Sequence, residues 1–413
     1  MHEGFLTDSE RKMTLSSFIV YPDWINKNRI TAYSIMLFLS IVSVLIYIAL
    51  IQWGILSPID IPIPSGFSSF YSAGTLAGQA DPTRVYDLGA HKAMQQAIYG
   101  DNRISYYFYF YPPYLLLVLA PLAALPYLVA FYVWVLAQAA LFLAGIRLII
   151  GKTSLWPFIA FPAAAISFAL GQNSLLTASL FAFGLLMRDK NRPFWAGFIL
   201  GLLVYKPHFG ILMPMAFVAG REWKMIGGAI TSVVLLTVIT TLAFGLSIWP
   251  AYLHLFQSTA PVAFESGRVT YNGLISAFGS VLLVGGSKET AYAVQAVFSL
   301  GAAVLVFYLW RRTTNTAIRC MSLIAGTMLS MPVILFYDYL PAAVALAFLV
   351  PELRKTGWMR WEKVLIIAIY MVALVGRPLA MAWNIPYGPI VGVILLWMAW
   401  RRHSASELYP ERI

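Results

Sequence analysis

Residues 32–56 read AYSIMLFLSIVSVLIYIALIQWGIL and include no charged side chain. An α-helix needs about 20 consecutive apolar residues to cross the ~30 Å hydrocarbon core of a bilayer, and this stretch is long enough to do so. Two other uncharged, apolar stretches lie at residues 225–244 and 321–337. Inside lipid only helices and closed barrels satisfy all backbone polar groups, so these stretches predict membrane-spanning helices.

The composition of the whole chain agrees with this prediction. Of its 413 residues 60% are apolar and 11% are charged, whereas a soluble domain is about half apolar and about one quarter charged. The formal net charge of +11 would suggest a nucleic-acid partner in a soluble protein, but here the basic residues form short clusters between apolar stretches. We therefore expect no nucleic-acid partner and an all-α polytopic membrane protein.

The basic clusters predict which loops face the cytoplasm, because Lys and Arg accumulate on that side. The first apolar stretch is too long for the core of a signal peptide, so we interpret it as an uncleaved anchor with the N-terminus inside. Alternation of basic and other polar loops then gives a bundle of about twelve transmembrane helices, with both ends of the chain in the cytoplasm. The basic clusters lie at residues 147–152, 188–192, 221–224, 311–319, 354–363 and 401–402.

A single transmembrane domain is the simplest division of the chain, because it contains no long repeat and no low-complexity linker. The expected parts are a basic cytoplasmic segment (1–30), the transmembrane domain (31–402) with external loops at 57–111 and 246–288, and a cytoplasmic tail (403–413).

The first external loop is not simply polar. Residues 90–98 place apolar side chains on one face of a helix that Asp87 can cap, which predicts an amphipathic helix on the outer membrane surface. The run YYFYFY at residues 106–111 suits either an interfacial aromatic belt or stacking against a sugar ring or lipid.

The sequence shows no phosphate-binding loop, metal-ligand cluster or paired carboxylates, so we expect neither a metal nor a cofactor. Lys206 and His208 end an apolar stretch on the expected external side, at the depth of a lipid phosphate. They indicate an anion site. The other interpretation is a lysine whose charged end reaches the interface beside a histidine.

Asp338 lies between two tyrosines, just before Pro341. It either caps a helix or supplies a carboxylate to a site. Ionisable groups at the edge of the hydrocarbon are costly and are often functional. The same reasoning selects other polar residues at the expected external helix ends, among them Asp60, Gln172, Asn173, Arg268 and Arg377.

Several short motifs, taken in order, resemble glycosyltransferase family 87, whose members are polytopic enzymes with the GT-C fold. The resemblance extends in motif order from about residue 60 to Pro341. The motifs are Phe67-x-x-Phe70-Tyr71-x-Ala73-Gly74, Tyr111-Pro112-Pro113, Gly171-Gln172-Asn173 and Lys206-Pro207-His208-Phe209-Gly210.

This resemblance implies transfer of a sugar, often mannose, from a polyprenyl-phosphate donor to a lipid or glycan acceptor. The reaction would invert the anomeric centre without a metal, at the outer face of a bacterial cytoplasmic membrane and among its lipids. A carboxylate, Asp60 or Asp338, would deprotonate the acceptor. The resemblance further implies that Lys206 and His208, with Arg268 or Arg377, stabilise the departing phosphate, and that Tyr71, Gln172 and Asn173 bind substrate.

One position departs from the family pattern, which usually has an aspartate, regarded as the general base, directly before Phe67. Here that residue is Gly66, and Asp60 lies six residues earlier, about 20 Å away if the chain is extended. Either Asp60 or Asp338 replaces the base, or the residue has been altered, or the chain is a degenerate relative that binds lipid-linked glycans without turnover. A transporter on this scaffold should show two related halves with paired broken helices, which the sequence does not.

Overall fold

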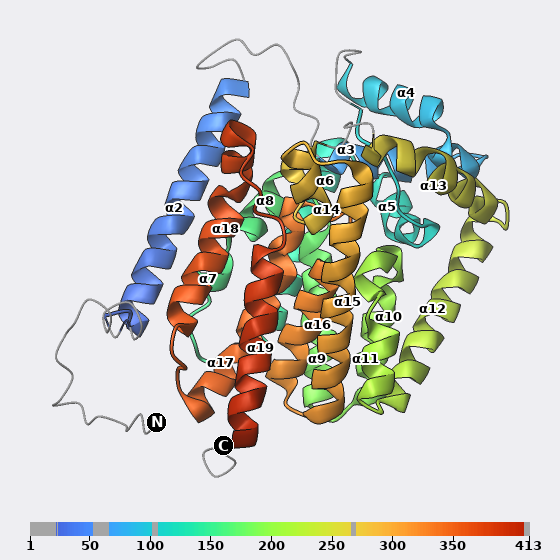
Figure 1. Cartoon of the computed structure of the whole chain (residues 1–413). Helices are drawn as coiled ribbons and strands as arrows, with labels where there is room; N and C mark the ends of the chain where they lie inside the picture. The colour runs from blue at the N-terminus through green and yellow to red at the C-terminus, as the bar shows by residue number, and fades with distance from the viewer. Residues whose placement is uncertain (1–21, 23, 53–65, 101–105, 266–269, 409–413) are drawn as a thin grey trace.

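The uncharged stretch near the N-terminus forms helix α2 (Lys27–Gln52), as predicted. The structure, a computed structural model, describes residues 22, 24–52, 66–100, 106–265 and 270–408. Within these residues the chain is helical, and the β pairing is limited to one isolated antiparallel bridge between Leu274 and Leu335. Long helices run roughly side by side, with α2 at the edge of the bundle (Figure 1).

Six helices in the described part of the chain are long and apolar enough to cross a membrane. The prediction of about twelve spans is therefore not confirmed. Helices such as α9 (Ser174–Asp189) and α16 (Thr316–Ser330) extend only about 22–24 Å at 1.5 Å per residue, because the chain breaks before they complete a crossing. Besides α2, the six are α6 (Tyr127–Ile150), α12 (Trp223–Phe244), α15 (Lys288–Arg312), α17 (Leu340–Thr356) with the turn before it, and α18 (Glu362–Trp383).

The remaining helices are shorter or less apolar. The chain breaks at residues 123–126, between α5 (Leu116–Leu122) and α6. The other short helices are α7 (Trp156–Ile159), α8 (Pro162–Ala169), α10 (Pro193–Gly201) and α11 (Met213–Ala219). Helix α19 (Ile390–Leu408) is 19 residues long, but its last part is polar and charged.

The outer surface of the bundle is apolar. Leu242 on α12 is 82% exposed and Val304 on α15 is 69% exposed, and similar side chains cover α2 and α6. A soluble protein rarely exposes so large an apolar surface, whereas a bilayer solvates it without cost. The chain is thus an integral membrane protein.

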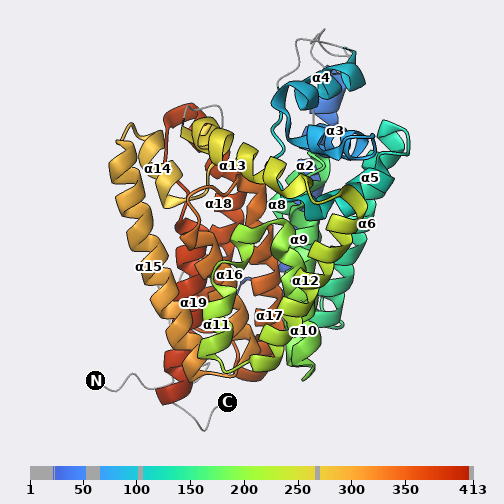
Figure 2. The same ribbon diagram turned by 90° about the vertical axis from the view of Figure 1, so that its right-hand side faces the viewer.

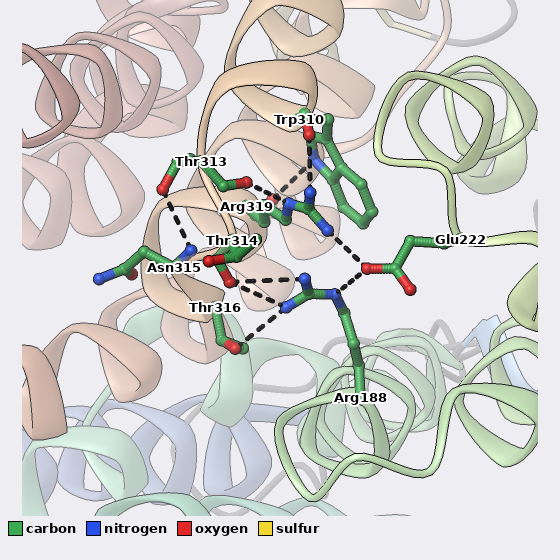
Figure 3. A network of polar contacts seen from close by, with 8 residues as sticks. All are labelled: Arg188, Glu222, Trp310, Thr313, Thr314, Asn315, Thr316 and Arg319. Carbon is green, nitrogen blue, oxygen red and sulfur yellow. Dashed lines mark hydrogen bonds and ion pairs between the residues drawn. The ribbon is translucent and has the colours of Figure 1, made fainter.

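One end of the bundle is basic. Helices α6, α9, α15 and α17 all carry arginine in their last turn, where a cation interacts favourably with the helix dipole. We call this the basic end. At this end Arg188 and Arg319 share one oxygen of Glu222, at 2.9 Å and 2.5 Å (Figure 3). Their other donors bind Thr316 Oγ1 and carbonyl oxygens of the α15–α16 connection, so this network joins the ends of α9, α12, α15 and α16.

The opposite end carries the helices of the two predicted loops, and we call it the aromatic end. Figure 2 shows α3 and α4 beside α13, which lies across the top of the bundle. The helix predicted over residues 90–98 is present as α4, and Asp87 Oδ1 accepts a hydrogen bond from Ala90 N at 2.6 Å. The helices at this end are α3 (Gly66–Ala77), α4 (Leu88–Tyr99), α13 (Ile248–Glu265) and α14 (Ala277–Leu283).

Helix α4 holds the aromatic run in place. Gln95 Nε2 donates to the carbonyl of Tyr107 at 2.6 Å, and Gln95 Oε1 accepts from the backbone N–H of Tyr107 at 3.1 Å. His91 is 1% exposed, and its Nε2 lies 3.1 Å from the carbonyl of Ser69. A carbonyl only accepts, so Nε2 carries the proton and Nδ1 is free to accept from Tyr106 Oη at 3.1 Å. Burial lowers the pKa of His91 to about 4.

This histidine predicts a pH-dependent contact. In the unfolded chain an imidazole binds a proton below about pH 6.5, whereas buried His91 does so only near pH 4. The contact between α4 and the aromatic run should therefore lose stability as pH falls from 6.5 towards 4, by roughly 2 kcal/mol at pH 5. Hydrogen-exchange protection of α4 at pH 7 and pH 5, corrected for intrinsic rates, measures this loss. His91→Gln should remove the pH dependence, and an unchanged dependence in that variant would exclude His91 as its source.

Candidate active site

Three breaks in the helices meet near the aromatic end. Asn173 precedes α9, after Gly171, whose backbone has a φ of +62° that favours glycine. Lys206 separates two short 3-10 helices, η3 (Leu202–Tyr205) and η4 (Pro207–Gly210), because Pro207 does not continue the preceding helix. Asp338 lies in η6 (Phe336–Tyr339), just before α17. Each break presents a polar side chain to the other two.

These side chains form one hydrogen-bonded cluster. Lys206 Nζ lies 2.6 Å from Asp338 Oδ1 and donates to Asn173 Oδ1 at 3.1 Å. Ser174 Oγ donates to the same Asp338 oxygen at 2.5 Å. We call Asn173, Ser174, Lys206 and Asp338 the polar cluster. Its members come from segments far apart in the sequence, which the fold brings to one place.

The polar cluster is buried. Lys206 and Asp338 are each 3% exposed, and Asn173 is fully enclosed. Charges removed from water are retained only when they are paired and hydrogen-bonded, which is the case for Asp338 Oδ1. Within the described residues no hydrogen bond engages Asp338 Oδ2. Asn173 Nδ2 is also buried, and the Asn173 amide faces the hydroxyl of Tyr111. One acceptor oxygen of the cluster, Asp338 Oδ2, is thus available to a ligand.

Aromatic residues surround the polar cluster. The ammonium of Lys206 lies 5.0 Å from the ring centre of Phe209 and 5.8 Å from that of Tyr337. Burial raises the pKa of Tyr111, and the charge of Asp338 raises it further, so this last residue of the aromatic run lies near the carboxylate. The run therefore packs at the cluster, in addition to any contact with the membrane interface.

Arg377 is a second cation beside this cluster. Its guanidinium lies over the ring of Phe336 at 4.0 Å, and Phe336 is two residues before Asp338. Its Nε is buried without a hydrogen-bond acceptor in the described part of the chain. Burial raises the pKa of Tyr107 and the charge of Arg377 opposes this, so Arg377 also lies near the aromatic run. Unlike Lys206, Arg377 forms no ion pair with a described residue.

The other predicted residues lie in different settings. The side chain of Gln172 fills the space beside Gly66, where an added Cβ would overlap its amide nitrogen and lie 2.6 Å from its Cδ. Tyr71 donates to the carbonyl of Leu125 at 2.9 Å and packs on Tyr127. The His208 ring contacts the ring of Phe209, and the imidazole forms no hydrogen bond to a described residue. Asp60 and Arg268 lie outside the described residues.

Sequence reasoning missed two residues of this site. Ser174 directly follows Asn173 and binds Asp338, and Tyr205 directly precedes Lys206. Tyr205 Oη lies 2.6 Å from Thr177 Oγ1 and donates to the carbonyl of Asn173 at 3.3 Å. Their position next to predicted site residues was the one sequence feature that could have identified them. The hydrogen-bond partners of Ser174 and Tyr205, however, depend on contacts across the bundle.

Comparison with protein-family models gives a match to glycosyltransferase family 87 over residues 109–337, more than half of the chain. The match includes Asn173 and Lys206, ends directly before Asp338 and begins after Gly66. Comparisons with curated proteins and with solved structures find no match.

Proposed function

The chain belongs to glycosyltransferase family 87, and we propose that it transfers a sugar from a polyprenyl-phosphate donor to a lipid or glycan hydroxyl. It is a membrane glycosyltransferase; the donor, the mechanism and the orientation are the parts proposed here. The observation that carries the proposal is the buried polar cluster, in which Asp338 offers an unused carboxylate oxygen beside the cation Lys206.

In the proposed reaction Asp338 acts as general base. The acceptor hydroxyl oxygen attacks the anomeric carbon, the bond from that carbon to the phosphate oxygen breaks, and the hydroxyl proton passes to Asp338 Oδ2. The polyprenyl phosphate leaves with the electron pair, and the anomeric configuration inverts. No metal is needed for this step, because protein cations stabilise the leaving phosphate.

Because Lys206 is paired with Asp338, its charge stabilises the leaving phosphate mainly during the reaction step. Before reaction the charge of Lys206 is compensated by Asp338 at 2.6 Å. When Asp338 takes up the proton it becomes neutral, so the positive charge of Lys206 is uncompensated at the moment the phosphate gains charge. An interaction that strengthens in the transition state accelerates the reaction, whereas one of constant strength does not. Arg377, with its unused Nε, is the second proposed phosphate ligand.

The depth of the cluster suits a lipid-linked donor. It lies at the start of α9, about 24 Å from the basic end, whereas α12 extends about 33 Å from the same end. A lipid phosphate and its first isoprene units lie at such a depth. Cytoplasmic loops are enriched in Lys and Arg, so we propose that the basic end faces the cytoplasm and the cluster opens outside.

The alternative is a non-catalytic relative, and the setting of Gly66 separates the two. The Gln172 amide occupies the space of a residue-66 side chain, so Gly66→Asp alone would displace Gln172. Gly66→Asp combined with Gln172→Ala provides the space. If Asp338 is the base, the purified wild type turns over a polyprenyl-phosphate sugar, and the double variant changes its rate by no more than a few fold.

A different result would support the non-catalytic alternative. An inactive wild type, together with a gain of about 10²–10⁴-fold in the double variant, would show that the base is missing and that the chain is a degenerate relative. Gln172→Ala alone is the matched control, because it opens the same space without adding a carboxylate.

A further inference from the structure

A cavity of about 340 Å³ lies between α2 and α18, away from the polar cluster. Its walls are almost entirely apolar. They include Ile30, Leu37 and Tyr33 from α2, and Ile366, Tyr370 and Met371 from α18. Both helices are candidate membrane spans, so the cavity lies within the thickness of the bilayer.

Helix α2 packs only loosely on the bundle. Its contacts in the described chain are chiefly with the short helices α7 and α8, as in the ring contact of Phe38 with Trp156 at 5.8 Å. Figure 1 shows α2 at the edge of the molecule beside α18. Helices in lipid associate through close packing and polar contacts. Here a gap remains along the two helices, where the surrounding hydrocarbon can enter.

Two lysines lie at the basic end of this cavity. Lys363 lines the cavity, and its Nζ donates to the carbonyls of Pro22 and Ile25 at 3.0 Å and 3.2 Å, which places the starts of α2 and α18 together. Lys27 is exposed at the first position of α2, three residues before Ile30, and so lies on the face of α2 that lines the cavity. Trp24 and Trp358 lie at the same end.

We propose that this cavity binds an anionic glycerophospholipid of the leaflet at the basic end. One acyl chain lies between α2 and α18, and the phosphate lies at Lys27, at the mouth of the cavity that Lys363 also lines. An apolar slot with lysine and tryptophan at one mouth matches the two parts of such a lipid, because lysine attracts anionic head groups and tryptophan favours the head-group level. The lipid fastens α2 to the bundle.

This site is distinct from that of the proposed donor. The polar cluster lies near the aromatic end, whereas the lysines lie at the basic end, so a lipid here presents its head group to the opposite leaflet. The inference stands whether or not the chain transfers sugar from a polyprenyl phosphate.

The experiment compares lipid retention by native mass spectrometry after exchange into vesicle lipid of defined composition. Wild-type protein should retain phosphatidylglycerol and lose phosphatidylcholine. Lys27→Gln should weaken phosphatidylglycerol retention about fivefold, since a lysine near a membrane contributes ~1 kcal/mol of attraction. Ser34→Trp, which fills the cavity wall, should reduce retention of any phospholipid while both lysines stay in place.

Lys190→Gln is the matched control, because Lys190 is an exposed lysine at the basic end outside the cavity lining. Equal retention of the two lipids, or equal losses for Lys190→Gln and Lys27→Gln, would overturn the proposal. Retention of a polyprenyl lipid, or of a second copy of the chain, in place of phosphatidylglycerol would overturn it as well.

Discussion

Asp338→Asn should reduce sugar transfer by about 10²–10⁴-fold, the usual effect of losing a general base. Asparagine keeps the shape of the side chain, and its oxygen can still accept from Ser174 and Lys206. It cannot take the acceptor proton. Because the donor phosphate binds the cations Lys206 and Arg377 and not the carboxylate, donor affinity should not fall with kcat. Rates and donor binding measured on the same detergent-solubilised preparation give both numbers.

Glu222→Gln provides the control for this variant. It removes a carboxylate from a partly buried ion-pair network, but at the basic end, where Glu222 binds Arg188 and Arg319. Its stability should fall, while the rate per folded molecule should stay near that of the wild type. If Asp338→Asn kept more than a tenth of the wild-type rate, another group would be the base.

Lys206→Met should lower the free energy of unfolding by about 3–5 kcal/mol, because it leaves Asp338 as a buried charge without its cation. Lys206→Met combined with Asp338→Leu removes both charges, and it should recover most of the loss. Thermal unfolding of these variants in one detergent measures the coupling energy between Lys206 and Asp338. The single Asp338→Leu variant completes the double-mutant cycle.

If the changes in unfolding free energy of the two single variants simply add in the double variant, Lys206 and Asp338 form no stabilising ion pair. A Lys206→Met variant as stable as the wild type would contradict the ion pair as well. Such a result would mean that the lysine is solvated in the membrane-bound protein, as in the alternative reading of Lys206 beside an interfacial histidine.

The membrane fold was predictable because it depends on local composition. A run such as residues 32–56 specifies a spanning helix wherever it lies, and α2 is present as expected. The number of spanning helices was not predictable from the sequence, because α9 and α16 end at breaks whose positions depend on neighbouring helices. Loop 246–288, expected to be external, contains α13 and α14, which sequence reasoning did not identify.

The candidate site was predictable in its members but not in its contacts. Lys206, Asn173 and Asp338 were each selected because polar groups at helix breaks are costly in lipid. The pairing of Lys206 with Asp338 could not be predicted, since 132 residues separate them in the sequence. This pairing changes the expected role of Lys206, from a free anion site to a cation whose charge is released by proton transfer.

The proposed reaction is tested by transfer of labelled sugar by the purified wild-type chain in vesicles with excess EDTA. A polyprenyl-phosphate sugar and a nucleotide sugar are offered separately, with Asp338→Asn in parallel. We expect transfer from the polyprenyl-phosphate donor alone, undiminished by EDTA and lost in Asp338→Asn. Transfer from the nucleotide sugar alone, or transfer that EDTA abolishes and a divalent ion restores, would contradict it.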